Sequence, residues 1–351
     1  MKVKYLKDWE NEMNICIRCA YCFEGCPVFK ELGWESDGAR GKVILSYGLL
    51  SGEIESSKNI ADKIFQCTYC KDCVERCSAD VSVPDILTAA RADLVDAGFA
   101  SDTHKHVIEN VKSTGNIFGD TEVISHEREG EIPLFIGCQY LSRPNKTKKY
   151  IKILEKIGIK PKVQKEICCG FPLKALGFEK EFHEHKKRFI ELFHHKEIIA
   201  FCPTCTMFLK EEYGLNVKHA TQVILDKMPK AELDMEVTYH DPCDLSRGLG
   251  IIDEPRGILK KLGVKVIEMK NSGKQSSCCG GGGGILMSDS PLSDRIAKNR
   301  IKQAIETGVD TLVTSCPTCE QVLKKAAAEI SESEGKNIVV RNIEDILWGM
   351  R

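Results

Sequence analysis

The spacing of the cysteines constrains this chain more than any other feature. Eighteen of its 351 residues are cysteine, with eight between Cys16 and Cys77 and ten between Cys138 and Cys319. A polar connector over residues 98–130, for which we expect one short helix, separates the two zones. Free thiols at this density are vulnerable to oxidation, so we expect the cysteines to be coordinated to metal.

The first zone contains two runs of one design, C-x2-C-x2-C-x3-C. In the bacterial ferredoxin spacing, three cysteines of a run bind one cubane 4Fe–4S cluster and the fourth binds the other cubane. Pro27 follows the first run and Ser78 the second; proline donates nothing to iron, so this difference does not affect ligation. The predicted ligand sets are Cys16, Cys19, Cys22 and Cys77 for one cubane, and Cys67, Cys70, Cys73 and Cys26 for the other.

Structural zinc is the alternative for these runs, because C-x2-C also suits tetrahedral zinc. Zinc sites pair two C-x2-C units, whereas each run here offers four cysteines in ferredoxin order. The flanking segments 39–50, 58–65 and 84–97 have helical patterns, the last with Pro84 at its start and Gly98 after its end. The zone therefore resembles the helical two-cluster ferredoxin domain of succinate dehydrogenase-type iron–sulfur subunits rather than the small β-rich ferredoxin.

The second zone is an internal duplication, because its ten cysteines form two sets of five with the same spacing pattern. Residues 153–159 match residues 258–264 at the 105-residue offset that separates Cys138 from Cys243. The first set is Cys138, Cys168, Cys169, Cys202 and Cys205, and the second is Cys243, Cys278, Cys279, Cys316 and Cys319.

Each copy has an α/β pattern. A β-rich apolar run, 134–138 or 237–240, leads to the first cysteine, and a helix that stops at Gly158 follows in the first copy. A second such run, 198–201 or 311–314, leads to the C-x2-C motif and another helix. Open α/β sheets bind ligands at the carboxyl ends of their strands, so the five cysteines of a copy should converge there. We predict a helical ferredoxin domain over residues 1–130, followed by a duplicated α/β cysteine-rich domain over 131–236 and 237–351.

Five cysteines exceed the ligands of a cubane or a zinc ion by one. Adjacent cysteines do not easily occupy two corners of one tetrahedral metal, but they can bind neighbouring irons of a larger cluster. The alternative of inert buried thiols fits poorly with the repetition of all five. The run Gly280–Gly284 lacks the Lys-Ser/Thr of a phosphate loop, and it predicts a close approach of the backbone to a cluster.

The pattern C-xn-C-C-G-xn-C-x2-C, present twice, resembles the cysteine-rich (CCG) domain of the catalytic subunit of heterodisulfide reductase. With the two ferredoxin runs in front, about residues 10–350 resemble the fused subunit of that enzyme. The resemblance implies that each five-cysteine set binds a noncubane 4Fe–4S cluster. It also implies that a thiol disulfide, such as the coenzyme M–coenzyme B heterodisulfide, is reduced between the two clusters, so that all ten cysteines are catalytic.

Iron–sulfur subunits of glycolate oxidase, lactate-utilisation enzymes and anaerobic glycerol-3-phosphate dehydrogenase share this architecture, often with one incomplete set. Both sets are complete here, which favours disulfide reduction. The alternative is an electron-transfer subunit of a flavin-dependent 2-hydroxy acid or glycerol-3-phosphate dehydrogenase. The flavin would then belong to a separate protein, because no G-x-G-x-x-G opens a βαβ unit in this chain. A redox sensor or scaffold ranks last, since it gives the repeated ligands no role.

The remaining properties bear on partners and location. The formal net charge of −1 gives no reason to expect nucleic acid as a partner. The sequence contains no apolar run of the ~18 residues that a spanning helix needs and no apolar signal-peptide core at its start, so we expect a cytoplasmic protein without membrane insertion of its own. The resemblance implies an electron donor, either a soluble flavoprotein or a membrane cytochrome b that would hold the chain at the inner membrane face.

Several charged or titratable residues near the cysteines have open roles. His240, close to Cys243, is a candidate proton donor to a departing thiolate, and the alternative is a residue that hydrogen-bonds a cluster or packs. Arg40 and Lys42 are candidates for tuning the potential of a cluster or for contacting a partner. The preferred interpretation is that both lie on an ordinary exposed face. The histidines of a Lys- and Glu-rich helical stretch should be solvated; they are His183, His185, His194 and His195.

Overall fold

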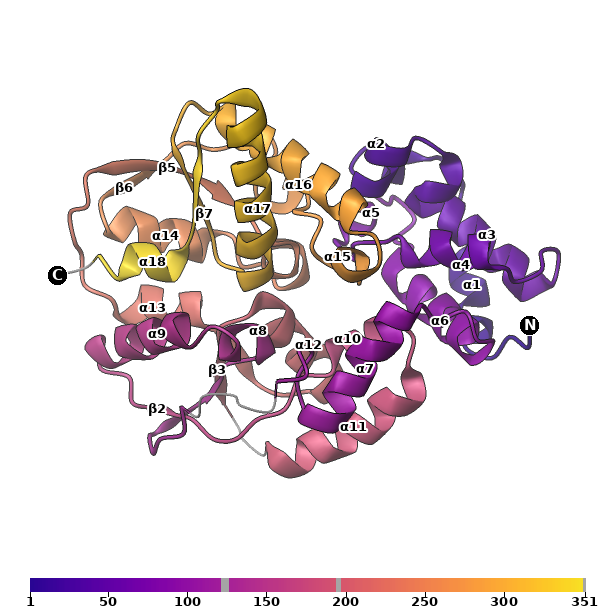
Figure 1. Cartoon of the computed structure of the whole chain (residues 1–351), viewed down its shortest axis with the longest axis horizontal. Coiled ribbons are helices and arrows are strands. Elements are labelled where there is room, and N and C mark those ends of the chain that lie inside the picture. Colours follow the sequence, from indigo (N-terminus) through magenta and orange to yellow (C-terminus); the bar gives the residue numbers. More distant parts are fainter. Residues whose placement is uncertain (121–125, 194–196, 350–351) are drawn as a thin grey trace.

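The computed structural model describes residues 1–120, 126–193 and 197–349. The helical N-terminal region occupies one end of the molecule, and two α/β halves lie beside it, one above the other in the view of Figure 1. Among the described residues, no helix combines the length and the apolarity that crossing a bilayer requires.

The N-terminal region is helical, and the described residues up to Gly115 contain no strand. The predicted helices over 39–50, 58–65 and 84–97 are confirmed to within one or two residues, and so is a helix in the connector. Gly98, just beyond the third of these helices, has the left-handed backbone (φ +89°) that favours glycine. The helices are α1 (Glu10–Asn14), α2 (Pro27–Leu32), α3 (Ala39–Ser51), α4 (Lys58–Phe65), α5 (Asp72–Glu75), α6 (Val83–Asp96) and α7 (Asp102–Thr114).

The first α/β half is built on a parallel four-stranded sheet with the order β2-β1-β3-β4. Its strands are β1 (Ile132–Phe135), β2 (Pro161–Lys162), β3 (Ile198–Ala200) and β4 (Val217–His219). Its helices are α8 (Cys138–Leu141), α9 (Pro144–Lys156), α10 (Phe171–Ala175), α11 (Glu179–Leu192), α12 (Pro203–Tyr213) and α13 (Ala220–Lys227).

The second half repeats this topology, with a parallel sheet in the order β6-β5-β7-β8. The duplication that the sequence predicts is therefore a duplication of the sheet as well. Its strands are β5 (Met235–His240), β6 (Val264–Val266), β7 (Thr311–Thr314) and β8 (Val339–Asn342). Its helices are α14 (Asp253–Lys261), α15 (Ile285–Ser288), α16 (Ser290–Ile305), α17 (Pro317–Glu334) and α18 (Ile343–Leu347).

The sequence determines where each copy turns from strand to helix. In both C-P-T-C motifs the first cysteine is the extended N-cap residue, and the proline begins the helix, where its fixed φ and missing N–H cost nothing. The third strand of each sheet therefore delivers its two cysteines to the first turn of α12 or α17. The cysteines lie beyond the carboxyl ends of the strands, as predicted for an open parallel sheet.

The two halves share a core. One buried apolar cluster includes Leu134 and Tyr150 of the first half and Val237 and Tyr239 of the second. Burial of apolar side chains on both sides of this boundary stabilises the halves against each other. The shared core fixes the relative positions of the two cysteine-bearing edges.

Candidate iron–sulfur and substrate site

The first five-cysteine set gathers at the carboxyl edge of the first sheet. Its five members are all buried, and each thiol lies close enough to the next to shift its pKa. The order of these neighbouring thiols is Cys138, Cys168, Cys169, Cys205 and Cys202.

The second set has the same arrangement at the edge of the second sheet. Its thiols contact one another in the order Cys243, Cys278, Cys279, Cys319 and Cys316. Four of these residues are buried, and Cys243 is half-buried. Each member of this order matches a member of the first set by position in its copy, so the duplication extends to the geometry of the thiols.

Both sets face one cavity of about 390 Å³ between the two halves. Nine of the ten cysteines line it, together with apolar side chains such as Phe171 and Leu286. Thr68 and Tyr69, from the second ferredoxin run, also line this cavity. Among the described lining residues, Asp244 is the one with an ionisable carboxyl or basic side chain. The cavity is thus a mostly apolar space bordered by thiols from both copies.

The chemistry of these thiols fits metal coordination. The contact with Cys168 and the burial of both groups hold the pKa of Cys138 well above its usual range, and the contact with Cys278 acts similarly on the pKa of Cys243. Several buried thiolates so close together would repel one another. Iron, whose clusters proteins hold with cysteine thiolates, provides the compensating positive charge, so the donor sets fit iron–sulfur clusters.

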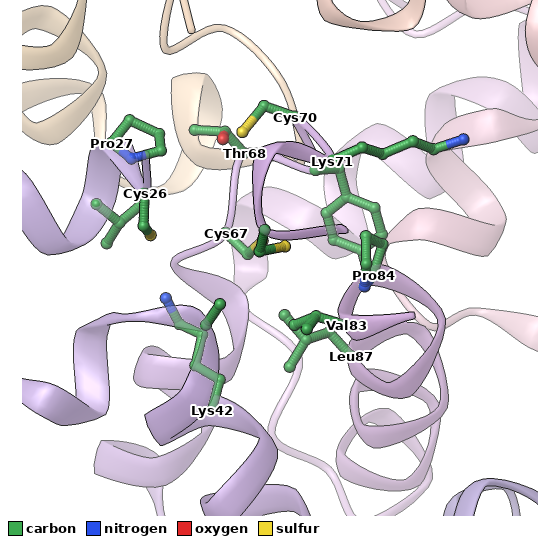
Figure 2. Close-up of a pocket in the computed structure, with 14 residues that line it drawn as sticks. Cys26, Pro27, Lys42, Cys67, Thr68, Cys70, Lys71, Val83, Pro84 and Leu87 are labelled. Carbon is green, nitrogen blue, oxygen red and sulfur yellow. The ribbon is translucent and has the colours of Figure 1, made fainter. Parts of the chain in front are cut away.

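Four cysteines of the ferredoxin runs line the smaller pocket shown in Figure 2, and they are Cys26, Cys67, Cys70 and Cys73. Burial raises the pKa of Cys26 to about 11, and the neighbouring Cys70 and Cys67 thiols add to this effect. Burial likewise raises the pKa of Cys22 to about 11, with contributions from Cys26 and from its own run. Cys26 therefore lies beside cysteines of the second run, which is the placement that the crossed ligand sets require.

Lys42 lies inside this region, so the expectation of an exposed face is wrong for it. Only 1% of its surface is exposed, and its ammonium donates to the carbonyls of Asp37 and Gln66, each at 2.5 Å. Burial lowers the pKa of Lys42, while Cys67 and Cys26 oppose this shift. Figure 2 shows its side chain reaching toward the side of the pocket where Cys26 lies.

Arg40 is partly exposed, so it agrees better than Lys42 with the expectation of an exposed face. Its guanidinium contacts Glu35 at 2.8 Å and donates to the carbonyl of Arg18 at 2.8 Å. It thereby connects the first ferredoxin run to the segment before α3. The burial of Lys42 two residues later follows from packing of α3, which sequence spacing does not reveal.

The ferredoxin region contacts the second copy directly. The thiol of Cys70 lies beside the thiol of Cys278, and this proximity, together with burial, holds the pKa of Cys70 well above its usual range. Arg247 is buried at this boundary, donating from Nε to the Cys70 carbonyl at 2.5 Å and from Nη1 to the Ser276 carbonyl at 2.8 Å. Sequence spacing does not predict either contact, because the partners lie far apart in the chain.

The glycine run belongs to the same boundary. A Cβ on Gly283 would lie 1.8 Å from the Cys67 carbonyl oxygen, and one on Gly282 would lie 2.4 Å from that of Thr68. The run thus permits a close approach, as predicted, and the group it approaches in the structure is the backbone of the second ferredoxin run. Arg91, buried in α6, donates to the Gly283 carbonyl at 2.9 Å and supports this contact.

The histidines differ from the sequence expectation in one case. His183 is exposed as predicted, but His185 is buried and its Nε2 contacts the Cys168 carbonyl at 2.6 Å. His185 is on the inner face of α11, although its neighbours in the sequence are solvated. The Lys- and Glu-rich composition of this stretch therefore does not predict that His185 is buried. His194 and His195 lie outside the described residues.

His240 is buried at the end of β5, and its Nδ1 accepts a hydrogen bond from Nε of Arg300 at 3.0 Å. Burial, with Arg300 adding to its effect, holds the pKa of His240 well below its usual range. His240 is therefore a neutral ring at neutral pH, and the structure gives no support to an imidazolium there. Its proton-donor role stays a prediction.

Two protein families match the chain. Residues 12–81 match the family described as 4Fe-4S dicluster domain. Residues 132–210 and 237–324 each match the family described as Cysteine-rich domain, or CCG. The two CCG matches cover the two parallel sheets except for the last strand of each, and the dicluster match covers both ferredoxin runs.

Curated relatives extend this similarity over the whole length. The chain is 29% identical over 357 residues to a subunit of the fumarate reductase (CoM/CoB) of Methanothermobacter marburgensis, covering 95% of the chain and 71% of the relative. It is 27% identical to a subunit of the dihydromethanophenazine:CoB–CoM heterodisulfide reductase of Methanosarcina barkeri, covering 96% of the chain and 93% of the relative.

A solved structure has the same fold. A hypothetical protein from Helicobacter pylori superposes with a TM-score of 0.60 at 11% sequence identity, covering 99% of the chain and 76% of that protein. At this identity the likeness concerns the fold alone. It agrees with a helical region followed by two α/β halves.

Proposed function

Since this chain belongs to the heterodisulfide reductase-like family, which joins a 4Fe–4S dicluster domain to two CCG domains, we propose that it reduces a thiol disulfide in the cavity between its two five-cysteine sets. The chain is an iron–sulfur oxidoreductase subunit in this proposal. Its parts are a ferredoxin domain over residues 1–130 and CCG domains over 131–236 and 237–351.

The observation that carries the proposal is the shared cavity. Thiols of both sets line one mostly apolar space of about 390 Å³. A disulfide placed there would have one sulfur toward each set. An electron relay needs closely spaced clusters, but it does not need a cavity bordered by two complete, equivalent ligand sets.

The proposed cofactors are two cubane and two noncubane 4Fe–4S clusters. When bound, such clusters supply electrons singly, and the reaction RSSR′ + 2 e⁻ + 2 H⁺ → RSH + R′SH needs two. The proposed cubane ligands are the eight cysteines of the ferredoxin runs, with Cys26 and Cys77 exchanged between the runs. The proposed noncubane ligands are the two five-cysteine sets.

The proximity of Cys70 to Cys278 supports a path for electrons between the ferredoxin domain and the CCG pair. Electrons would come from a partner, either a flavoprotein or a membrane cytochrome b. The coenzyme M–coenzyme B heterodisulfide is one candidate substrate, because the names of two relatives contain these thiol coenzymes.

The test is disulfide reduction by the iron-replete full chain with a chemically reduced viologen dye as donor. The substrates would be a panel of simple and mixed thiol disulfides, and the control is the same protein after chelators have removed its iron. We expect dye oxidation with two thiols released per disulfide, and only in the iron-replete protein.

Failure to reduce any disulfide would contradict the proposal. Co-purification with a flavoprotein, together with lactate, glycolate or glycerol-3-phosphate oxidation by the pair, would then support the alternative of a dehydrogenase subunit.

A further inference from the structure

The two cysteine sets differ at one matched position. His240 ends β5 in the second copy, and Phe135, at the same 105-residue offset as the first cysteines, ends β1 in the first copy. Phe135 packs edge-on against Phe189 of α11, with ring centroids 5.7 Å apart. His240 instead contacts Arg300 of α16, the helix that corresponds to α11. A polar pair thus replaces an aromatic pair beside the second set.

The contact with Arg300 fixes the tautomer of His240. A guanidinium Nε has a proton to donate and no lone pair to offer, so Nδ1 of His240 must be the acceptor in the 3.0 Å hydrogen bond. A neutral imidazole has one N–H, and that proton is consequently on Nε2.

Arg300 is held in place by other contacts. Its Nη1 donates to the Asn271 carbonyl at 3.0 Å and its Nη2 to the Ser276 hydroxyl at 3.1 Å. The side chain is fully buried, and burial lowers its pKa to about 10, so it stays charged at neutral pH. It cannot exchange donor and acceptor roles with His240.

The Nε2–H group has no hydrogen-bond partner in the part of the chain that the structure describes, and the His240 ring lies close to two cysteines of the second set. Nε2 is buried, and no described residue is its hydrogen-bond partner. A ring nitrogen of His240 and the Sγ atoms of Cys279 and Cys319 all lie within 4.8 Å of one another. A buried donor without a partner destabilises the folded protein, so a sulfur acceptor at this place would remove a penalty.

We propose that His240 donates an Nε2–H···S hydrogen bond to the cluster held by the second set, through Cys279, Cys319 or a cluster sulfide, and that this bond makes the second cluster easier to reduce than the first. A hydrogen bond to a cluster sulfur favours the reduced, more negative form. His240 is then a positioning residue that sets which member of the pair accepts an electron first.

The first set has the opposite surroundings. Phe135 offers no donor, and the carboxyl of Glu166 accepts from the backbone N–H groups of Ile136 and Gly137, at 3.0 and 2.6 Å. Ser276 stands at the place in the second copy that Glu166 occupies in the first, two residues before the paired cysteines. The positive charge of Arg300 beside the second set also favours earlier reduction of the second cluster.

This inference rests on the proposed function only in requiring that the second set binds a cluster. Its test is an EPR-monitored redox titration of the iron-replete full chain. The signal missing from the variant Cys278→Ala/Cys279→Ala identifies the second cluster. The variants are His240→Phe, which copies the first half, and His240→Gln, which keeps an N–H donor. The control is His219→Gln, which alters a buried histidine away from the second set.

In His240→Phe we expect the reduced-to-oxidised ratio of the second cluster, at a fixed ambient potential, to fall about tenfold. This corresponds to a midpoint potential that is about 59 mV lower for a one-electron couple. His240→Gln should restore much of this ratio, and the first cluster and His219→Gln should be unchanged. An unchanged second cluster in His240→Phe would overturn the inference. Absence of the clusters would instead contradict the proposed function.

If His240→Phe does not fold, the wild-type protein still decides the question. Pulsed EPR with ¹⁵N-histidine should give a weak nitrogen coupling and a deuterium-exchangeable proton at the second cluster. A strong coupling, as expected for an iron-bound nitrogen, or none, would overturn the hydrogen bond.

Discussion

The two cysteine-rich halves have the same ligand geometry in different surroundings. Their strand order is the same, and their thiols contact one another in the same sequence. Around the first set the structure has Phe135, Phe189 and Glu166, and around the second it has His240, Arg300 and Arg247. The comparison teaches that duplication preserved the places for metal ligands while the electrostatic environment diverged.

The halves also differ in their attachment to the ferredoxin region. The second half contacts it through Cys278, Arg247 and the glycine run. For the first half, Lys71 of the second ferredoxin run contacts Sδ of Met207 and the carboxylate of Glu211, each at 3.3 Å, and Arg91 donates to the Ala175 carbonyl at 2.8 Å. In the second half, by comparison, a cysteine of the five-cysteine set lies beside a thiol of the ferredoxin runs, and the buried arginines Arg247 and Arg300 lie close to that set.

The largest effect should come from removing one pair of adjacent cysteines. The variants Cys168→Ala/Cys169→Ala and Cys278→Ala/Cys279→Ala should each lose about four iron atoms of about sixteen. Each should abolish disulfide reduction, because the two sets are proposed to act as a pair. Iron analysis and the viologen assay measure this. Retained activity in either variant would show that the sets are not equivalent partners in the reaction.

The next effect concerns what holds the halves together. Lys146 of the first half contacts Glu320, Glu344 and Asp345 of the second, at 2.7, 2.8 and 2.9 Å. Lys146→Met should lower the free energy of unfolding by about 3–5 kcal/mol, because it leaves the fully buried carboxylate of Glu344 without its cation, whereas Glu320 and Asp345 keep Lys324 and Lys149.

The matched control is Lys149→Met, which breaks a more exposed pair with Asp345 and should cost at most about 1 kcal/mol. Chemical denaturation of the two variants measures the difference. Equal losses would show that burial of the carboxylates does not determine the effect.

A smaller effect should follow from adding a methyl group to the glycine run. Gly283→Ala places its Cβ against the Cys67 carbonyl at a left-handed backbone position (φ +63°), and should cost about 3 kcal/mol. Gly335 has a similar backbone (φ +66°) but no atom within 4 Å of a Cβ, so Gly335→Ala should cost only about 1 kcal/mol. Thermal unfolding compares them, and a cost for Gly335→Ala as large as for Gly283→Ala would remove close packing as the cause.

The smallest effect is a difference in pH dependence. His219 caps α13 in the first half, where Asn342 caps α18 in the second. Burial lowers the pKa of His219 to about 4. Between pH 6.5 and 4.5 the unfolded chain therefore binds more protons at this site than the folded chain, and stability falls as the pH falls.

His219→Asn should remove about 2 kcal/mol of this loss between pH 6.5 and 4.5. Unfolding free energies of both proteins at several pH values measure the difference. Parallel pH curves would contradict the assignment to His219.

Sequence patterns predicted much of the fold but little of the packing around the site. Local signals, such as Pro84 at the start of α6 and Gly98 after its end, predicted element ends because they act within a few residues. The burial of Lys42 and His185 and the contact of Cys70 with Cys278 depend on how distant segments pack, which spacing does not encode. Proximity to Cys243 in the sequence pointed to His240, but its contact with Arg300 depends on packing between distant segments.

The most direct test of the paired site is EPR of the oxidised, iron-replete protein before and after addition of a small thiol. Thiols are products of the proposed reaction, so they should bind at the cavity and induce a new paramagnetic signal. This signal should be absent from both paired-cysteine variants. No thiol-induced signal in the wild-type protein, with its clusters shown to be present, would contradict disulfide reduction and leave only electron relay.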